Sequence, residues 1–513
     1  MKNMKNFKLI IAVVAAFLFT LSCGREDLDV TNPNQVVVAT YYKNGNELRN
    51  GVYSIYASWQ SLQLYAREYF FLHDLRGDDN KAGGGQLETP RNQLLIGTND
   101  PGNSVARDVW TGLYAVILRS NIVIEQGPGV EDISEGLRTA LIAEAKLMRG
   151  WAYFELGSLW GGAPIYTTYA STFEDSAPKS SQEDVLAQAI QDLQDAASGL
   201  PLASNTEQVG RFSKGTAQAM LGRALMFTGD YAGAKNAFDA IVDSGEYALV
   251  DEYDDNFQEE NEYNNESIAE IGYANVGGFN WNGTGDDVGN EQSVRTQEYS
   301  AVGWRNLIPS EGLLNEFERT SKGDAKDDPR FAKSFYTLGD TFNNGESVLT
   351  DVQGEETTFE GVTTKISWRK YSLMYKTDPG GFLTGGINMR VIRYAEVLIN
   401  LAECELELGN SSRAISLLNQ VRSRPSVDMP PYPTANFPVS NPTEVMEAII
   451  HEKRVELSSE QIRNRDILRW RKEGKLATEP IAHYSPKLEL LPIPQSEIDN
   501  NSNLSEADQN PGY

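Results

Sequence analysis

Two loop-rich segments of the chain, around residues 70–100 and 250–380, concentrate side chains that could recognise a ligand. Aromatic rings offer flat apolar faces to the C–H side of a sugar ring, and planar amide, carboxylate and guanidinium groups can bond hydroxyl groups in pairs. The chemistry these residue types suit is carbohydrate binding. The candidate ligand residues are Trp281, Trp304, Tyr299, Asn280, Asn282, Arg76, Asp78, Asp79 and Asn80.

Most of these candidates also have a plainer structural interpretation. Trp304 and its neighbour Tyr273 could equally pack in the core, whereas Trp281 is flanked by asparagine and glycine and is the strongest single candidate. The pairs Asp78-Asp79 and Asp286-Asp287 could bind sugar, bind calcium or form solvated turns, and neither has the ligand spacing of an EF-hand. We therefore predict no metal ligand.

No residues with a catalytic pattern are found. A glycoside hydrolase would need two carboxylates that flank a cleft, and none of the 72 acidic residues is distinguished by its spacing. The chain has no nucleophile elbow, phosphate loop or dinucleotide fingerprint. Its 3 histidines and 2 cysteines are too few for a Cys/His zinc site. The sequence favours a binding protein that uses no cofactor over an enzyme.

The first 22 residues have the pattern of a lipoprotein export signal. A basic start precedes the apolar run from Leu9 to Phe19, which is too short to cross a bilayer because a spanning helix needs about 20 apolar residues. Small residues then precede Cys23. We predict that Cys23 is lipidated and that residues 23–45 form a tether. Plain secretion is the alternative, because Thr20 stands where such signals usually have an aliphatic residue.

Composition limits the class of protein and of partner. With 513 residues and 40% apolar content, the chain can form one large domain or two ordinary ones. Its formal charge of −27 disfavours nucleic acid and other anionic polymers, so a neutral ligand is the simpler expectation. Once Cys23 is acylated, Cys404 has no partner for an internal disulfide.

Helical periodicity and an internal repeat specify the elements that must position the loops. Apolar residues recur at three- and four-residue spacing outside residues 250–380, and helices are predicted around 137–160, 180–245, 390–425 and 441–472. One tetratricopeptide-like copy consists of Leu221, Gly222, Leu225, Gly229, Ala234, Phe238 and Ile241. A second copy has Leu401, Ala402, Gly409, Ala414, Leu418 and Val421 at the same offsets. The pattern predicts antiparallel helix pairs with loops inserted between them.

A run of alternating charges extends from Glu452 to Arg469 at helical spacing. Such runs are usually salt-bridged structural helices, so we predict a structural role for it.

With these elements in place, the chain resembles the SusD/RagB family of outer-membrane nutrient-binding lipoproteins of Bacteroidetes. The resemblance extends along nearly all of the mature chain. The residues that carry it are Glu144-Ala145-Lys146, Arg149, Trp151, Tyr153-Phe154, Pro164, Ile392 to Leu398, Ala402-Glu403, Glu452, Arg454, Glu456-Leu457, Glu460, Arg463, Asp466, Arg469-Trp470, Pro492-Ile493-Pro494 and Gln509 to Tyr513.

The resemblance implies a mainly α-helical fold, in which a tetratricopeptide-like scaffold of helical pairs carries a loop-rich, mixed ligand-binding region. It implies a single domain over residues 46–513. It also implies a SusC-like TonB-dependent transporter in the outer membrane, over which the lipoprotein sits as a lid. The acidic residues just after Cys23 resemble a surface-export signal of Bacteroidetes lipoproteins, which indicates that the protein faces outward.

The function predicted from the residues and the resemblance together is cell-surface binding of an oligosaccharide or polysaccharide, which is passed unaltered to the transporter. The acidic composition favours a neutral glycan such as a β-glucan. The alternative is a RagB-like lid that binds peptides. The loops that carry tryptophan and asparagine favour sugar over peptide.

Overall fold

The computed structural model describes residues 38–169, 176–276, 279, 291–377 and 383–513. The chain divides into two compact units, Met1–Lys43 and Asn44–Tyr513. The short helix α2 (Val38–Tyr41) belongs to the first unit, and all elements given below belong to the second. Cys23 and the predicted export signal lie outside the described residues.

Helices dominate the unit Asn44–Tyr513, as predicted for a mainly α-helical fold class. The helices of its N-terminal half are α3 (Gly45–Trp59), α4 (Glu68–Asp74), α5 (Thr89–Leu95), α6 (Ser104–Gln126), α7 (Glu135–Leu159), α8 (Gln182–Gly199), α9 (Lys214–Phe227) and α10 (Tyr231–Ser244). Those that follow are α11 (Arg295–Tyr299), α12 (Glu311–Glu316), α13 (Arg330–Ser334), α14 (Tyr394–Glu407), α15 (Ser411–Arg422), α16 (Pro442–Leu457), α17 (Arg463–Lys472) and α18 (Gln495–Asn500). None of the helices in the described ranges is both long and apolar enough to cross a membrane.

Side-chain caps fix where several long helices begin. The Asn44 side chain accepts hydrogen bonds from the first backbone N–H groups of α3, and Ser134 accepts one at the start of α7. Asn441 caps α16, with Pro442 at the first helical position, where a missing N–H costs nothing. These local signals explain why the helix starts are readable in the sequence.

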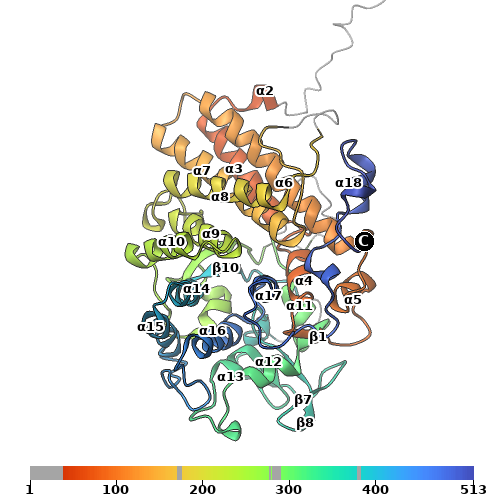
Figure 1. The fold of residues 1–513 in the computed structure, drawn as a ribbon, viewed down its shortest axis with the longest axis vertical. Helices are drawn as coiled ribbons and strands as arrows, with labels where there is room; N and C mark the ends of the chain where they lie inside the picture. Colours follow the sequence, from red (N-terminus) through yellow and green to blue (C-terminus); the bar gives the residue numbers. More distant parts are fainter. Residues whose placement is uncertain (1–37, 170–175, 277–278, 280–290, 378–382) are drawn as a thin grey trace, which may run out of the picture. The chain divides into compact units, whose positions relative to one another are not determined.

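The long helices pack one after another into a continuous stack. Helix α6 packs on α7, α7 on α8, α8 on α9 and α9 on α10, and α10 then contacts α14 (Figure 1). Glycines permit the close approach: a Cβ added to Gly222 of α9 would lie 2.4 Å from the Phe238 ring of α10. A Cβ on Gly157 of α7 would lie 2.7 Å from Leu186 of α8. Gly222 therefore has the role in the repeat that its spacing predicts.

Five separate antiparallel strand pairs are found among the described residues, and most of their strands lie between α10 and α14. The pairs are β1 (Asn80–Ala82) with β3 (Leu307–Pro309), β2 (Ser267–Ile271) with β10 (Met389–Arg393), β4 (Phe335–Thr337) with β9 (Ile366–Trp368), β5 (Thr341–Phe342) with β6 (Ser347–Val348), and β7 (Thr357–Phe359) with β8 (Val362–Thr364). Each pair is short, so irregular loops make up most of this region.

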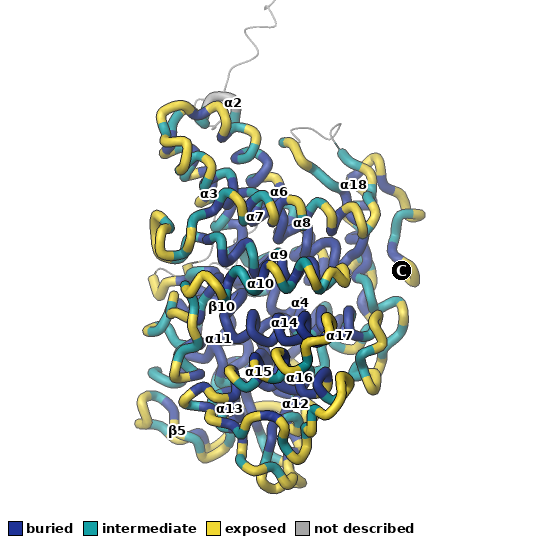
Figure 2. The backbone as a smooth tube through the Cα atoms, turned by 60° about the vertical axis from the view of Figure 1, so that its left-hand side comes forward, coloured by how far each residue is buried: buried dark blue, intermediate teal, exposed yellow. Residues whose placement is uncertain are grey.

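The core contains stacked aromatic rings and almost wholly buried helices. Trp59 of α3 stacks on Trp151 of α7 with ring centroids 4.0 Å apart. Helix α14 is buried along nearly its whole length, as its dark blue tube in Figure 2 shows. The aromatic face expected from the spacing in α3 thus forms part of the core.

Ion pairs form a second, charged part of the core. Arg330 of α13 donates to Glu452 at 2.6 Å and to Glu456 at 2.9 Å, and all three side chains are fully buried. Arg393 of β10 contacts Glu456 at 2.6 Å. The structural interpretation of the charge series that begins at Glu452 is confirmed, because its carboxylates tie α16 to elements more than 60 residues away in the sequence.

Candidate functional site

The structure describes only some of the predicted ligand residues. Asn280, Trp281 and Asn282 lie outside the described residues, as does the pair Asp286-Asp287. Phe279 is described and partly exposed.

The acidic pair just before β1 is engaged within the fold. The burial of Asp79 corrects the prediction that it contacts a ligand, whereas for Asp78 that contact stays a prediction. The Asp78 carboxylate accepts hydrogen bonds from Arg463 at 2.7 Å and lies 2.8 Å from Arg454. Asp79 is buried and accepts from Arg454 Nε at 2.8 Å. Burial alone would raise the pKa of Asp78, but the positive charges of Arg463 and Arg454 outweigh it and lower the pKa. The pair therefore ties β1 to α16 and α17.

Arg76 and Asn80 are also engaged within the fold. The burial of Asn80 corrects its assignment as a ligand residue, whereas the assignment of Arg76, which is partly exposed, stays a prediction. The Arg76 guanidinium donates to the backbone carbonyls of Leu488 at 3.0 Å and Glu489 at 3.2 Å. The Asn80 side-chain oxygen accepts from the indole N–H of Trp368 at 2.8 Å, and both groups are buried. These contacts hold the 75–97 loop against distant parts of the chain.

Tyr299 has no ring face available for stacking, so its prediction is corrected as well. Its side chain is 1% exposed, and the Arg295 guanidinium carbon lies 3.7 Å from the ring centroid. Its hydroxyl donates to Asp74 at 3.1 Å. Tyr273 is likewise buried, in line with the alternative of core packing.

Trp304 is the predicted aromatic residue that the structure leaves partly exposed, among those it describes. Its backbone is held on both sides. The N–H donates to the carbonyl of Gln297 at 2.6 Å, and the carbonyl accepts from Gln86 Nε2 at 2.8 Å and from Gln353 Nε2 at 3.3 Å. Helix α11, which precedes Trp304, and two more distant segments that contain Gln86 and Gln353 therefore hold the backbone of this residue.

The neighbouring residue Arg305 anchors the same loops from inside. Its side chain is 0% exposed, and the guanidinium donates to the carbonyls of Gln353, Glu355 and Ile366, each at 2.9 Å, and to the Ser367 hydroxyl at 2.7 Å. Burial lowers the pKa of Arg305 to about 10, which still leaves it charged at neutral pH. A planar fork of donors is suited to satisfying several carbonyls at once.

Two glycines allow the loops to approach each other at backbone distance. Gly83 N–H donates to Asn306 O at 2.9 Å, and Glu355 N–H donates to Gly83 O at 2.7 Å. A Cβ on Gly83 would lie 1.7 Å from the Arg305 carbonyl oxygen, and one on Gly354 would lie 2.0 Å from the Gly83 oxygen. Only glycine fits this contact at either position.

The resulting Trp304 surface, defined here as Trp304 with Gln86 and Gln353, combines a partly exposed aromatic ring on a hydrogen-bonded backbone with two exposed amides. The two amide groups bond the backbone of Trp304 through their nitrogens. Within the described ranges, their side-chain oxygens accept no hydrogen bond. The geometry suits a ligand that has an apolar face and hydroxyl groups. Sequence reasoning missed both glutamines, although each directly adjoins a glycine-bearing turn.

Two family models match the chain. One, described as the SusD family, matches residues 265–513, and the other, described as starch-binding associating with outer membrane, matches residues 88–226. Both describe SusD-type proteins, and together they span well over half of the sequence. The chain belongs to the SusD family.

Relatives of this SusD-family chain match it over nearly their full length. SusD-like protein P25 of Formosa agariphila is 26% identical, and the match covers 98% of this chain and 99% of that protein. A laminarin binding SusD-like protein of known structure is 26% identical, with a TM-score of 0.73 and coverage of 92% and 100%. A SusD superfamily protein from Bacteroides vulgatus has a TM-score of 0.75 at 24% identity and coverage of 91% and 99%. These likenesses confirm the predicted fold class.

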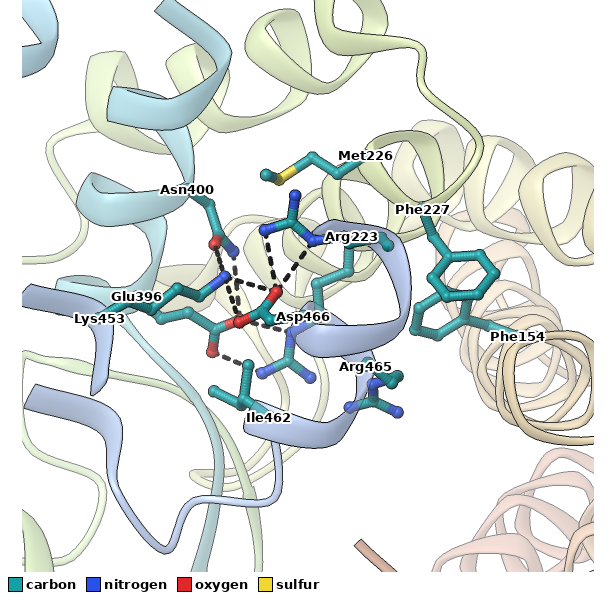
Figure 3. Close-up of a pocket in the computed structure, with 11 residues that line it drawn as sticks. Phe154, Arg223, Met226, Phe227, Glu396, Asn400, Lys453, Ile462, Arg465 and Asp466 are labelled. Carbon is teal, nitrogen blue, oxygen red and sulfur yellow. Dashed lines mark hydrogen bonds and ion pairs between the residues drawn. The ribbon is translucent and has the colours of Figure 1, made fainter. Parts of the chain in front are cut away.

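A second polar cluster in this SusD-family chain surrounds a cavity of about 30 Å³ among α9, α14, α16 and α17 (Figure 3). Arg223 donates to Glu396 at 2.6 Å, and Lys453 donates to Asn400 at 2.7 Å and to Asp466 at 2.9 Å. Figure 3 shows these side chains pointing toward one another. Because the charges have partners and the space admits only a water or two, the cluster stabilises helix packing.

In the part of the chain that the structure describes, no group of three or more His, Cys, Asp or Glu side chains is arranged to hold a metal ion. The carboxylates of Asp78 and Asp79 face arginines instead.

Proposed function

We propose that this SusD-family protein binds a neutral oligosaccharide or polysaccharide at the Trp304 surface. The observation that carries the proposal is the position of Trp304, whose backbone is held by Gln297, Gln86 and Gln353 while its indole stays partly exposed. A backbone that is already held in place loses little conformational freedom on binding. The similarity to a laminarin binding protein supports a β-glucan as the ligand.

Charge around the Trp304 surface supports a neutral ligand over an anionic one. Glu355 and Glu356 are exposed on the loop that Arg305 anchors, and they add negative charge beside Trp304. Lys81 of β1 donates to the Glu356 carbonyl at 2.8 Å. Carboxylates at this position would repel uronate or sulfate groups.

The proposed cellular role follows from the sequence pattern. We propose that Cys23 is lipidated, that residues 23–45 tether a single domain over residues 46–513 to the outer membrane, and that this domain faces outward. The ligand would pass unaltered to a SusC-like TonB-dependent transporter. Asn280, Trp281 and Asn282 remain proposed ligand residues.

Affinity electrophoresis tests the binding site. The mature protein is run through gels that contain laminarin, other neutral polysaccharides or alginate, alongside Trp304→Ala, Trp281→Ala and the control Tyr484→Ala, which removes another partly exposed aromatic ring. We expect laminarin to retard the wild type and Tyr484→Ala but not Trp304→Ala. Equal retardation of wild type and Trp304→Ala would contradict the proposed site. If no polysaccharide retards the wild type, the glycan proposal is wrong and peptides become the ligands to test.

A further inference from the structure

A cavity of about 340 Å³ opens between the first half of α7, the end of α8 and the segment 200–212. Its volume is within the range of small-ligand sites. In Figure 1, α7 and α8 lie toward the upper end of the unit Asn44–Tyr513, whereas β7 and β8, which adjoin the loops of the Trp304 surface, lie at its lower end. The cavity is therefore separate from the Trp304 surface.

The walls of the cavity are largely apolar. Leu137 and Ala140 of α7 line one side, and Leu200 and Pro201 line the side that follows α8. Phe212 lies behind them and packs against the core. Such walls favour a ligand with an apolar face.

The charged groups at the cavity cancel in pairs. Arg211 binds Glu144 with two hydrogen bonds, of 2.8 Å from Nε and 2.6 Å from Nη2, and Tyr56 also donates to Glu144 at 2.8 Å. On the rim, Arg49 pairs with Glu207 at 2.8 Å. The lining and rim thus carry no net charge from these groups, so neither an anion nor a cation is favoured.

Polar groups with unused hydrogen-bonding capacity remain beside these walls. Among the described residues, the buried Arg211 Nη1 has no hydrogen-bond partner, and it lies 3.9 Å from a carboxylate oxygen of Glu207. The Asn205 side chain is exposed at the rim, and its amide has no partner within the described ranges. An amide both donates and accepts, which suits hydroxyl groups.

We propose that this cavity is a second binding site, which takes one or two units of a neutral hydroxylated ring, such as a sugar. The apolar walls would contact the C–H face of the ring, and Asn205 would bond its hydroxyl groups at the rim. The volume of the cavity, its lack of net charge and its mixture of apolar and amide groups all suit such a ligand. The proposal rests on the proposed function for the choice of sugar as the ligand, but not for the position of the site.

The test uses laminaribiose as the probe and saturation-transfer NMR with isothermal titration as the measurements, on the mature protein. The background is Trp304→Ala, which removes the first proposed site. In it, Ala140→Phe fills the cavity, and Ala187→Phe makes the same substitution at an exposed position of α8 outside the lining. Asn205→Ala removes the rim amide without adding bulk.

We expect the Trp304→Ala protein to retain laminaribiose binding. In this background, Ala140→Phe should weaken the binding at least tenfold and Asn205→Ala severalfold. Ala187→Phe should leave it unchanged. Equal binding by the Ala140→Phe and Ala187→Phe proteins would overturn the second site. If Ala140→Phe fails to fold by circular dichroism, unchanged binding by Asn205→Ala overturns it instead. Absence of any laminaribiose binding in the Trp304→Ala protein overturns it too.

The two proposals fail in different ways. If Trp304→Ala leaves laminarin retardation intact while Ala140→Phe abolishes laminaribiose binding, the first site is wrong and the second stands. If Trp304→Ala abolishes both laminarin retardation and laminaribiose binding, the first site stands and the second is wrong.

Discussion

Replacing Gly83 by alanine should disturb the position of Trp304 without touching its side chain. The added Cβ would lie 1.7 Å from the Arg305 carbonyl oxygen and 2.9 Å from its carbonyl carbon. Both are backbone atoms, so no side-chain rotation can relieve the clash. Because real Cβ contacts are essentially never shorter than 3.0 Å, the two segments must separate by at least about 1.3 Å.

The size of the effect follows from what that separation breaks. Gly83 makes two backbone hydrogen bonds across the contact, to Asn306 O at 2.9 Å and from Glu355 N at 2.7 Å. Each contributes about 0.5–1.5 kcal/mol net. We expect Gly83→Ala to lower the free energy of unfolding by about 1–3 kcal/mol, and to weaken laminarin binding severalfold because Trp304 is no longer held in one position.

Gly85→Ala is the matched control. Its added Cβ meets nothing within 4 Å, and its φ is not in the left-handed region, so we expect unchanged laminarin binding and a free energy of unfolding that is equal or up to about 1 kcal/mol higher. Urea unfolding and affinity electrophoresis measure the two effects. If Gly83→Ala behaves like Gly85→Ala in both assays, the loop contact does not fix Trp304. Lower stability with unchanged laminarin retardation would separate the contact from ligand binding and refute the proposed site.

Two further predictions concern the scaffold. Gly222→Ala should cost about 1–3 kcal/mol in urea unfolding, because its Cβ would lie 2.4 Å from the Phe238 ring, whereas Gly136→Ala, which meets nothing, should not destabilise; equal stability of the two variants would contradict the close helix approach. Burial alone would raise the pKa of Glu403, but the charge and hydrogen bonds of Arg469 lower it to about 2. The ionised carboxylate therefore stabilises the fold above the unfolded-state pKa near 4.5, and on the order of 3 kcal/mol should be lost as pH falls from there toward 2. Glu403→Gln should flatten that loss, and an unchanged pH profile would refute the assignment.

The helical scaffold was predictable because its signals are local. The repeat around Gly222 and Phe238 lies within about 20 residues, and Asn441 with Pro442 marks a helix start within one turn. Such patterns indicate which side of a helix packs against its neighbour, and they do not depend on residues far away in the chain. The strongly charged series from Glu452 was assigned a structural role on the same grounds.

The ligand residues were less predictable because residue type does not reveal distant partners. Asp78 and Asp79 have the composition of a sugar or calcium site, yet each pairs with arginines more than 370 residues later in the chain. Tyr299 is aromatic and lies in a loop-rich segment, but Arg295 and Asp74 enclose it. In both cases partners within the fold occupy the polar groups of these side chains, and Asp79 and Tyr299 are buried as well.

The sequence by itself determined the fold class, the family resemblance and the general position of the loop-rich region, since helix periodicity and capping act over a few residues. Only the tertiary structure decided which side chains remain accessible on those loops. The Trp304 surface exists because segments near Gly83, Trp304 and Gln353 meet at backbone distance. Gln86 and Gln353 lie 218 and 49 residues from Trp304. Contacts over such separations leave no local pattern in the chain, so the glutamines beside Trp304 could not be recognised from sequence alone.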